Sequence, residues 1–271
     1  MQDFGEFAAR ERDGWANEGL VSAYVDKFVP VTDSIARVLV ERSSPRDKSI
    51  LDLCCGQGTL TAMLCDAGAK VTGLDFSNEM LARAALNAPE ADLRQGDAGS
   101  LPFDDGAFDQ VVCNFGMMHL PDQQKALSEV QRVLRPDGRF LMATWAAPDV
   151  SPAFGTVFGA IRGNADFSKA PAQPDLFVFA KPEGAREMMK VSGLRVVSHE
   201  IVPAFWELSE PGELFEIFLT ATVAASQLIK GQEPEVIGAI QEQITDNVRE
   251  NFGDEGGFRV PVPVAIVEAA L

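Results

Sequence analysis

A carboxylate followed by a glycine turn is the first feature of this sequence that suits chemistry. Asp52 lies in the short apolar run Ile50–Leu53, and Gly56 and Gly58 follow it. An apolar run between charge and glycine is typical of a buried parallel strand, and the residues from Thr59 onward suit a helix. Such a unit binds ligands, because the helix N-terminus offers free N–H groups and glycine lets a ligand approach the backbone.

The missing third glycine limits the classes of ligand that this turn could bind. The dinucleotide fingerprint G-x-G-x-x-G needs a third glycine, but this chain has Thr61 there, which disfavours a nicotinamide oxidoreductase. The acid at Asp52 suits a ligand that presents a cation rather than a pyrophosphate. From this stretch alone, an ordinary turn with chance glycines stays an alternative.

Two more carboxylates follow the next two predicted strands. Lys70–Leu74 predicts a second strand that ends in Asp75, nineteen residues after Gly56. This is near the spacing of an acid that accepts hydrogen bonds from both hydroxyl groups of a ribose. Ala91–Gly96 predicts a third strand, which leads to Asp97.

The end of the fourth predicted strand carries further candidates. The strand is predicted over Phe108–Cys113, and Asn114, Phe115 and His119 follow it. Ligands of open α/β sheets bind at the carboxyl ends of the strands, so these three are active-site candidates. His119 is also the candidate general base, whereas His199 falls inside a later predicted strand and is expected to be structural.

Four stretches resemble the motifs of one family, and one of them is G-D-A-x-x-L-P-F, which contains Asp97 and Ala98. D-x-x-x-G-x-G resembles the first motif of class I S-adenosylmethionine (SAM) methyltransferases, with Cys54 where the family usually has glycine. G-L-D-F-S-x-x-M-L, which contains Asp75, Phe76 and Met80, resembles the second motif. H-L-x-D-x-x-x-A-L-x-E-x-x-R-V-L-x-P-x-G resembles the type 11, ubiquinone/menaquinone methyltransferase-like branch. The resemblance covers residues 15–147 and thins beyond them.

The resemblance implies SAM as cofactor and S-adenosylhomocysteine (SAH) as product. Asp75 would bind the ribose, Phe76 and Met80 would sandwich the adenine, and Asp97 with the Ala98 N–H would meet the adenine edge. Trp15 and Tyr24 either touch the cofactor or pack against the sheet, and both alternatives stay open. The cofactor-binding residues implied are Tyr24, Asp52, Cys54, Gly56, Gly58, Asp75, Phe76, Met80, Asp97, Ala98, Asn114 and Phe115.

The implied fold is α/β and Rossmann-like: a mostly parallel seven-stranded sheet with an antiparallel last strand, plus a helical lid insertion. We expect a helical cap over residues 1–47 and a SAM-binding core over 48–210, with a loop insert at 148–181. Residues 211–252 are predicted to form a helical insertion that serves as a lid or as a dimer interface. Residues 253–271 would supply the last strand of the core.

Composition restricts the partners. The chain has 271 residues, 46% of them hydrophobic, and a net charge of −17, which argues against nucleic acid or an anionic membrane as partner. Its N-terminus does not resemble a signal peptide, and no apolar run reaches membrane-spanning length. The four cysteines lack metal-ligand spacing, so we expect reduced thiols, no metal site and a cytoplasmic protein.

The acceptor is expected to be a small apolar or aromatic molecule, methylated on oxygen or carbon by in-line displacement. The chain reads C-N-F-G after the fourth strand, without the N/D-P-P-aromatic signature of amino methylation, and it has no Pro-Cys pair to attack cytosine. A homodimer is possible. The competing interpretation is a non-catalytic SAM- or SAH-binding protein with a regulatory or scaffold role.

Overall fold

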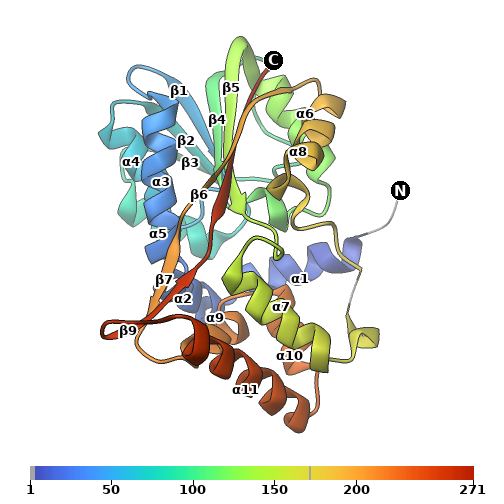
Figure 1. Cartoon of the computed structure of the whole chain (residues 1–271). Helices are drawn as coiled ribbons and strands as arrows, with labels where there is room; N and C mark the ends of the chain where they lie inside the picture. Colours follow the sequence, from blue (N-terminus) through green and yellow to red (C-terminus); the bar gives the residue numbers. More distant parts are fainter. Residues whose placement is uncertain (1–3, 171) are drawn as a thin grey trace.

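A seven-stranded sheet forms the centre of the protein (Figure 1). The computed structural model describes residues 4–170 and 172–271; residues 1–3 of the predicted cap and residue 171 of the predicted loop insert lie outside the described residues. The strands of this sheet are β1 (Ser49–Leu53), β2 (Lys70–Asp75), β3 (Asp92–Gln95), β4 (Phe108–Asn114), β5 (Leu134–Trp145), β6 (Arg195–Val202) and β10 (Val264–Ala270). Their order is β3-β2-β1-β4-β5-β10-β6.

The pairing of these strands matches the predicted fold class. The pairs β1–β2, β2–β3, β1–β4 and β4–β5 are parallel, whereas β10 pairs antiparallel with both β5 and β6. The carboxyl ends of β1, β2 and β4 therefore meet at one edge of the sheet. The predicted Rossmann-like sheet with an antiparallel last strand is confirmed.

Helices cover both faces of the sheet. The helices of the first half are α1 (Gly5–Trp15), α2 (Glu18–Lys27), α3 (Val29–Ser43), α4 (Thr59–Asp66), α5 (Asn78–Asn87) and α6 (Gln123–Val133); α8 (Pro182–Val191) comes later. Ile50 and Val112 pack with α3 and α4, whereas Leu51 and Val111 pack with α6 and α8. Neighbouring residues of one strand thus enter opposite cores, as the pleat requires.

The predicted loop insert at 148–181 is not a loop throughout. It contains the helix α7 (Pro152–Asn164), in which the Ser151 hydroxyl accepts from the Phe154 N–H. Phe154, Val157 and Ile161 are buried at helical spacing. Glycine, a poor helix former, stands at positions 155, 159 and 163 and interrupts the apolar pattern. The sequence therefore did not predict this helix.

The segment predicted as one last strand is also divided. Only β10 joins the main sheet, whereas β9 (Gly257–Pro261) pairs with β7 (Phe205–Leu208) and β8 (Gly253–Asp254) in a second sheet of order β7-β9-β8. Pro261 is the last residue of β9, and Pro263 stands between β9 and β10. Proline has no N–H to donate to a ladder, so the chain leaves one sheet here and enters the next.

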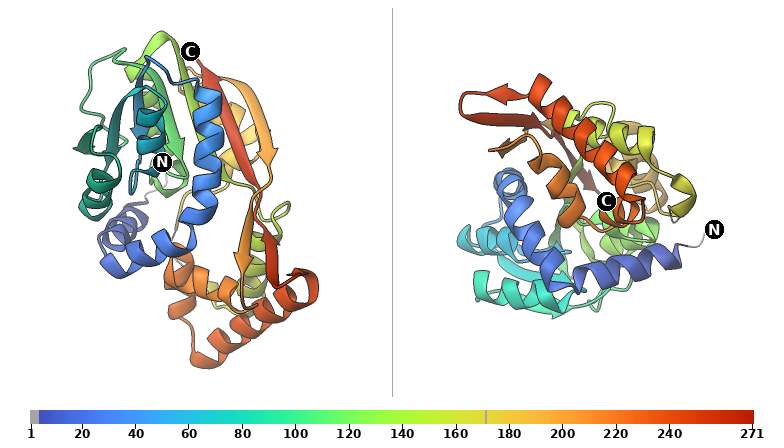
Figure 2. Two further views of the ribbon diagram at one scale, coloured as in Figure 1. Left: turned by 90° about the vertical axis from the view of Figure 1, so that its left-hand side faces the viewer. Right: turned by 90° about the horizontal axis from the view of Figure 1, so that it is seen from below.

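The predicted insertion at 211–252 forms three helices: α9 (Glu213–Thr220), α10 (Ala224–Lys230) and α11 (Pro234–Asn251). They lie below the main sheet with α7 and the second sheet (Figures 1 and 2). Phe215, Phe218 and Val223 are buried within this chain. These apolar side chains are therefore buried by contacts within the same chain.

No helix among the described residues is long and apolar enough to cross a membrane.

Candidate functional site

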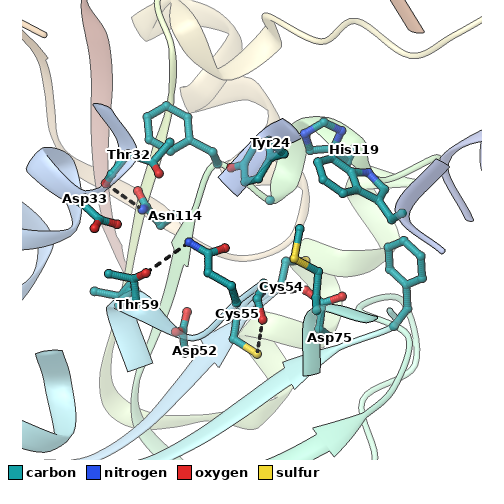
Figure 3. Close-up of a pocket in the computed structure, with 18 of the residues that line it drawn as sticks. Tyr24, Thr32, Asp33, Asp52, Cys54, Cys55, Thr59, Asp75, Asn114 and His119 are labelled. Atoms are coloured by element: carbon teal, nitrogen blue, oxygen red, sulfur yellow. Dashed lines mark hydrogen bonds between the residues drawn. The ribbon is translucent and has the colours of Figure 1, made fainter. Parts of the chain in front are cut away.

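A cavity lies at the carboxyl edge of the main sheet (Figure 3). We call it the turn cavity, because the turn between β1 and α4 lines it. It also contacts α2 and α3 from the N-terminal helices and the segment after β4. Ten of the residues predicted from sequence line it: Tyr24, Asp52, Cys54, Gly56, Asp75, Phe76, Met80, Asn114, Phe115 and His119.

Three predicted residues lie outside this lining. Gly58 starts α4 with a φ of +83°, and a Cβ there would come within 2.9 Å of Ala84, so this glycine allows α4 to pack against α5. Asp97 is exposed, and its Oδ1 accepts from the Gly99 N–H at 2.8 Å. Ala98 is buried in the core beneath α6. Their cofactor contacts stay predictions.

The glycine turn presents open backbone to the cavity. Gly56 has a φ of +54°, and the nearest atom to a Cβ built there would be Met80 Sδ at 3.9 Å. Cys54, which replaces the usual glycine, has a φ of +57°. This left-handed conformation costs a residue with a Cβ about 1–2 kcal/mol. The substitution is thus accommodated with backbone strain at the site.

Asp75 joins the turn to the second strand. Its Oδ2 accepts from the Gly56 N–H and its Oδ1 from the Ser77 N–H, both at 2.9 Å. Burial raises the pKa of this carboxyl, and the backbone hydrogen bonds oppose the rise. Each oxygen keeps a second lone pair, so Asp75 can still accept hydrogen bonds from a ligand.

Asp52 is held by the residue that replaces the third glycine. The Thr61 hydroxyl donates to Asp52 Oδ2 at 2.6 Å, and both side chains are buried. Burial raises the pKa of Asp52 to about 7, with a further contribution from the charge of Asp75. A buried carboxyl of this kind gains from a cationic partner.

Asp33 on α3 is a further polar group that lines this cavity and was not predicted from the sequence. Asp33 lies beside Thr32 and Asn114 (Figure 3), and burial raises the pKa of its carboxyl. Asn114 Nδ2 donates to the Thr32 carbonyl oxygen at 3.2 Å, whereas its buried Oδ1 finds no partner among the described residues. An unpartnered acceptor beside a carboxylate fits a ligand that carries an ammonium group.

An aromatic cavity of about 640 Å³ adjoins the turn cavity. The two share Trp15, Tyr24, Phe115 and His119 as lining residues, so they lie side by side. Both aromatic residues left open above, Trp15 and Tyr24, therefore face the cavities rather than the sheet alone. The aromatic side chains that line it beyond these are Phe7, Phe28, Trp145, Phe154, Phe158, Phe167, Phe177 and Phe218.

Phe115 lies between the two cavities, and its backbone is strained. Its φ is +59°, an outlier for a bulky residue. Its ring packs on Trp145 with centroids 4.0 Å apart. Strained residues of this kind cluster at functional sites, because the surrounding packing must hold them there.

Comparison with known proteins agrees with this geometry. Residues 51–142 match the family described as a methyltransferase domain, of type 11. A demethylmenaquinone methyltransferase of Thermus thermophilus is 38% identical over 168 residues, which are 55% of this chain and 75% of that protein. The chain belongs to the class I SAM-dependent methyltransferases. It is a SAM-dependent methyltransferase.

A second relative and a solved structure also match this methyltransferase. A demethylmenaquinone methyltransferase of Renibacterium salmoninarum is 39% identical over 109 residues, 40% of this chain and 46% of that protein. The chain thus spans less than half the length of that relative. The YcgJ protein of Bacillus subtilis has a TM-score of 0.57 at 20% identity and is covered over 97% of its length, with 87% of this chain aligned; it supports the fold.

Proposed function

We propose that this methyltransferase transfers the SAM methyl group to a flat, apolar acceptor with an acidic hydroxyl group, such as a reduced quinone. The observation that carries the proposal is the aromatic cavity of about 640 Å³ that adjoins the turn cavity. Its volume lies in the range of small-molecule sites, about 300–1,000 Å³. Eleven of its lining residues are Phe, Tyr or Trp, whose rings favour a planar apolar ligand.

The hydrogen-bond acceptors and carboxylates of the turn cavity suit SAM. The unpartnered Asn114 Oδ1 and the carboxylate of Asp33 suit the ammonium group of its methionine portion. The buried Asp52 favours positive charge nearby. When bound, SAM supplies a methyl group that its sulfonium has already made electrophilic.

The nucleoside half of the cofactor is assigned to the residues after β2. Asp75 would accept from the ribose hydroxyls, and Phe76 and Met80 would sandwich the adenine; all three line the turn cavity. The turn cavity encloses only about 80 Å³, below the ordinary range for ligands. We therefore expect Trp15 and Tyr24 on α1 and α2 to move outward when the cofactor enters.

The choice of methyl acceptor rests on the residues that line the aromatic cavity and on the names of the relatives. The relatives are named for demethylmenaquinone, a naphthoquinone that carries a prenyl chain. Among the described residues, Arg162 is the one lysine or arginine that lines the aromatic cavity. Phe154 and Phe218 pack edge to face 5.4 Å apart in its wall, so an aromatic ring and an apolar tail would both find apolar contacts. The helices α9 and α10 close this cavity as a lid.

The chain's contribution to the reaction is mainly orientation. Holding an oxygen or ring carbon in line with the methyl group lowers the barrier by avoiding a bimolecular encounter. The wall formed by Phe115 and Trp145 fixes where the ring can lie relative to the cofactor. The buried aromatic side chains also exclude water, which would otherwise compete as a nucleophile.

SAM binding is expected to strengthen as the pH rises. The pKa of Asp52 is about 7, so below this pH the group is neutral and does not attract a cation. A bound cation favours the carboxylate, and binding at lower pH therefore releases a proton. We expect the affinity to rise by up to about tenfold per pH unit below about 7 and then to level off. Calorimetry between about pH 6 and 8 measures this, and Asp52→Asn should flatten the slope.

The acceptor assignment is tested by transfer of a deuterated methyl group. The enzyme is incubated with SAM labelled as CD₃ and with a reduced naphthoquinone carrying a short prenyl chain. Mass spectrometry should find one CD₃ group in place of one hydrogen of the acceptor. A catechol and a charged phenol sulfonate serve as comparison acceptors and should react more slowly. Faster transfer to the charged phenol would contradict the apolar assignment.

A further inference from the structure

Glu11 on α1 is buried and bonded to a histidine 108 positions later in the chain. Its side chain is only 5% exposed, and its Oε2 lies 2.9 Å from His119 Nδ1. The same oxygen accepts from the Trp15 indole N–H at 2.8 Å. The rings of Trp15 and His119 meet edge to face with centroids 5.3 Å apart. One carboxylate therefore ties α1 to the segment after β4.

The donors around Glu11 decide the proton positions on the imidazole. An indole N–H only donates, so Oε2 acts as an acceptor. A carboxylate accepts from both neighbours, which requires His119 Nδ1 to carry a proton. In the neutral imidazole the other nitrogen, Nε2, then has a free lone pair.

His119 stands where the two cavities join. It lines both of them, and its side chain is 32% exposed. In Figure 3 it lies beside Tyr24, on the side of the turn cavity away from Asp52. A side chain that takes up a proton at this junction would lie next to the methyl acceptor in the aromatic cavity and next to the cofactor in the turn cavity.

Other titratable groups near this junction suit the proton transfer less well. Burial raises the pKa of the Tyr24 phenol, so it is a donor. A hydrogen bond with Cys113 raises the pKa of Cys54, and burial raises that of Cys55. The remaining charged groups that line either cavity are Asp33, Asp52, Asp75, Arg162 and Asp175.

We propose that Glu11 is a positioning residue that holds His119 with Nε2 free to take the proton of the acceptor's hydroxyl group. This rests on the proposed function. The acceptor O–H bond breaks, its electron pair stays on the oxygen, and an N–H bond forms at Nε2. The resulting imidazolium is stabilised by the Glu11 carboxylate and later returns the proton to solvent. His119 is the catalytic residue, and Glu11 acts through it.

The test combines a tautomer measurement with a double-mutant cycle. ¹⁵N NMR of the SAH-bound protein should find His119 protonated on Nδ1, and Glu11→Met should move the proton to Nε2. With the reduced prenylated naphthoquinone as acceptor, His119→Gln should lower kcat by about 10²–10⁴-fold. Glu11→Met should lower kcat by at least about tenfold, and the double variant should be no slower than His119→Gln alone.

Further measurements separate this role from a structural one. SAH affinity and the acceptor KM should stay within about twofold in Glu11→Met and in the milder Glu11→Gln. His199→Gln, at the second histidine, should leave kcat unchanged and identifies its own NMR signals. Additive losses in the double variant, a fall of SAH affinity with kcat, or a wild-type proton on Nε2 would each overturn the proposal. An Nδ1 proton without turnover of this acceptor supports the pairing and counts against the proposed function alone.

Discussion

Replacing Asp75 with alanine is expected to weaken SAM binding by about 1.5–3 kcal/mol, or about 10- to 150-fold. Asp75 is buried, and it already accepts from the N–H groups of Gly56 and Ser77. Its removal would cost the proposed ribose hydrogen bonds and would also leave the Gly56 turn without its partner. Calorimetry with SAM measures the loss, and an affinity within about a factor of two of wild type would refute the ribose assignment.

A cofactor analogue separates the two contributions of Asp75. Wild-type enzyme should bind SAH more tightly than 2′-deoxy-SAH, because one ribose hydroxyl then lacks its acceptor. Asp75→Ala should lose this preference, whereas damage to the Gly56 turn alone would weaken both ligands equally. Asp97→Asn is the matched control: Asp97 is exposed and outside the turn cavity, and an amide oxygen can still accept, so its loss should be smaller.

The polar residues and the glycine turn at the carboxyl edge of the main sheet could be predicted, because neighbouring residues in the sequence indicate them. Asp52 lies within one apolar strand pattern and Asp75 ends the next, and parallel strands bring their carboxyl ends together. The glycine turn at Gly56 is equally readable, because only its neighbours decide its conformation. The structure brings all three to one cavity.

The groups that the sequence did not reveal come from helices whose docking is tertiary. Glu11 reads as one more charge on a polar helix, yet it is 4% exposed. Asp33 falls within a helical pattern, and nothing local shows that it faces the turn cavity. Thr61 registered only as a missing glycine, although its hydroxyl holds Asp52.

The sequence showed the aromatic residues of this cavity but did not predict that they line a common space. Phe154 and Phe177 stood in a stretch without clear period, and Phe218 in a helix of unknown partner. Burial depends on how α7 packs against α9 and α11, which are distant in sequence. The same packing makes deletion of residues 211–252 a poor test of the lid, because buried Ile240 and Ile244 belong to the core it would remove.

A bulky side chain inside the aromatic cavity is a sharper test. Ala225 on α10 lines the cavity and is partly exposed at the edge of the core, so Ala225→Trp fills acceptor space. We expect kcat/KM for the reduced prenylated naphthoquinone to fall by at least about tenfold, since the ring can no longer reach its in-line position. Gln227→Trp, on an exposed position of the same helix, is the control and should leave both binding steps unchanged.

The most direct test of the two-cavity account is the pair of constants measured on Ala225→Trp: SAH affinity by calorimetry and the acceptor KM by turnover. The account predicts SAH affinity within about twofold of wild type and an acceptor KM raised by at least about tenfold. An unchanged acceptor KM would mean that the acceptor does not enter the aromatic cavity. A fall in SAH affinity equal to the rise in KM would mean that this space belongs to the cofactor instead.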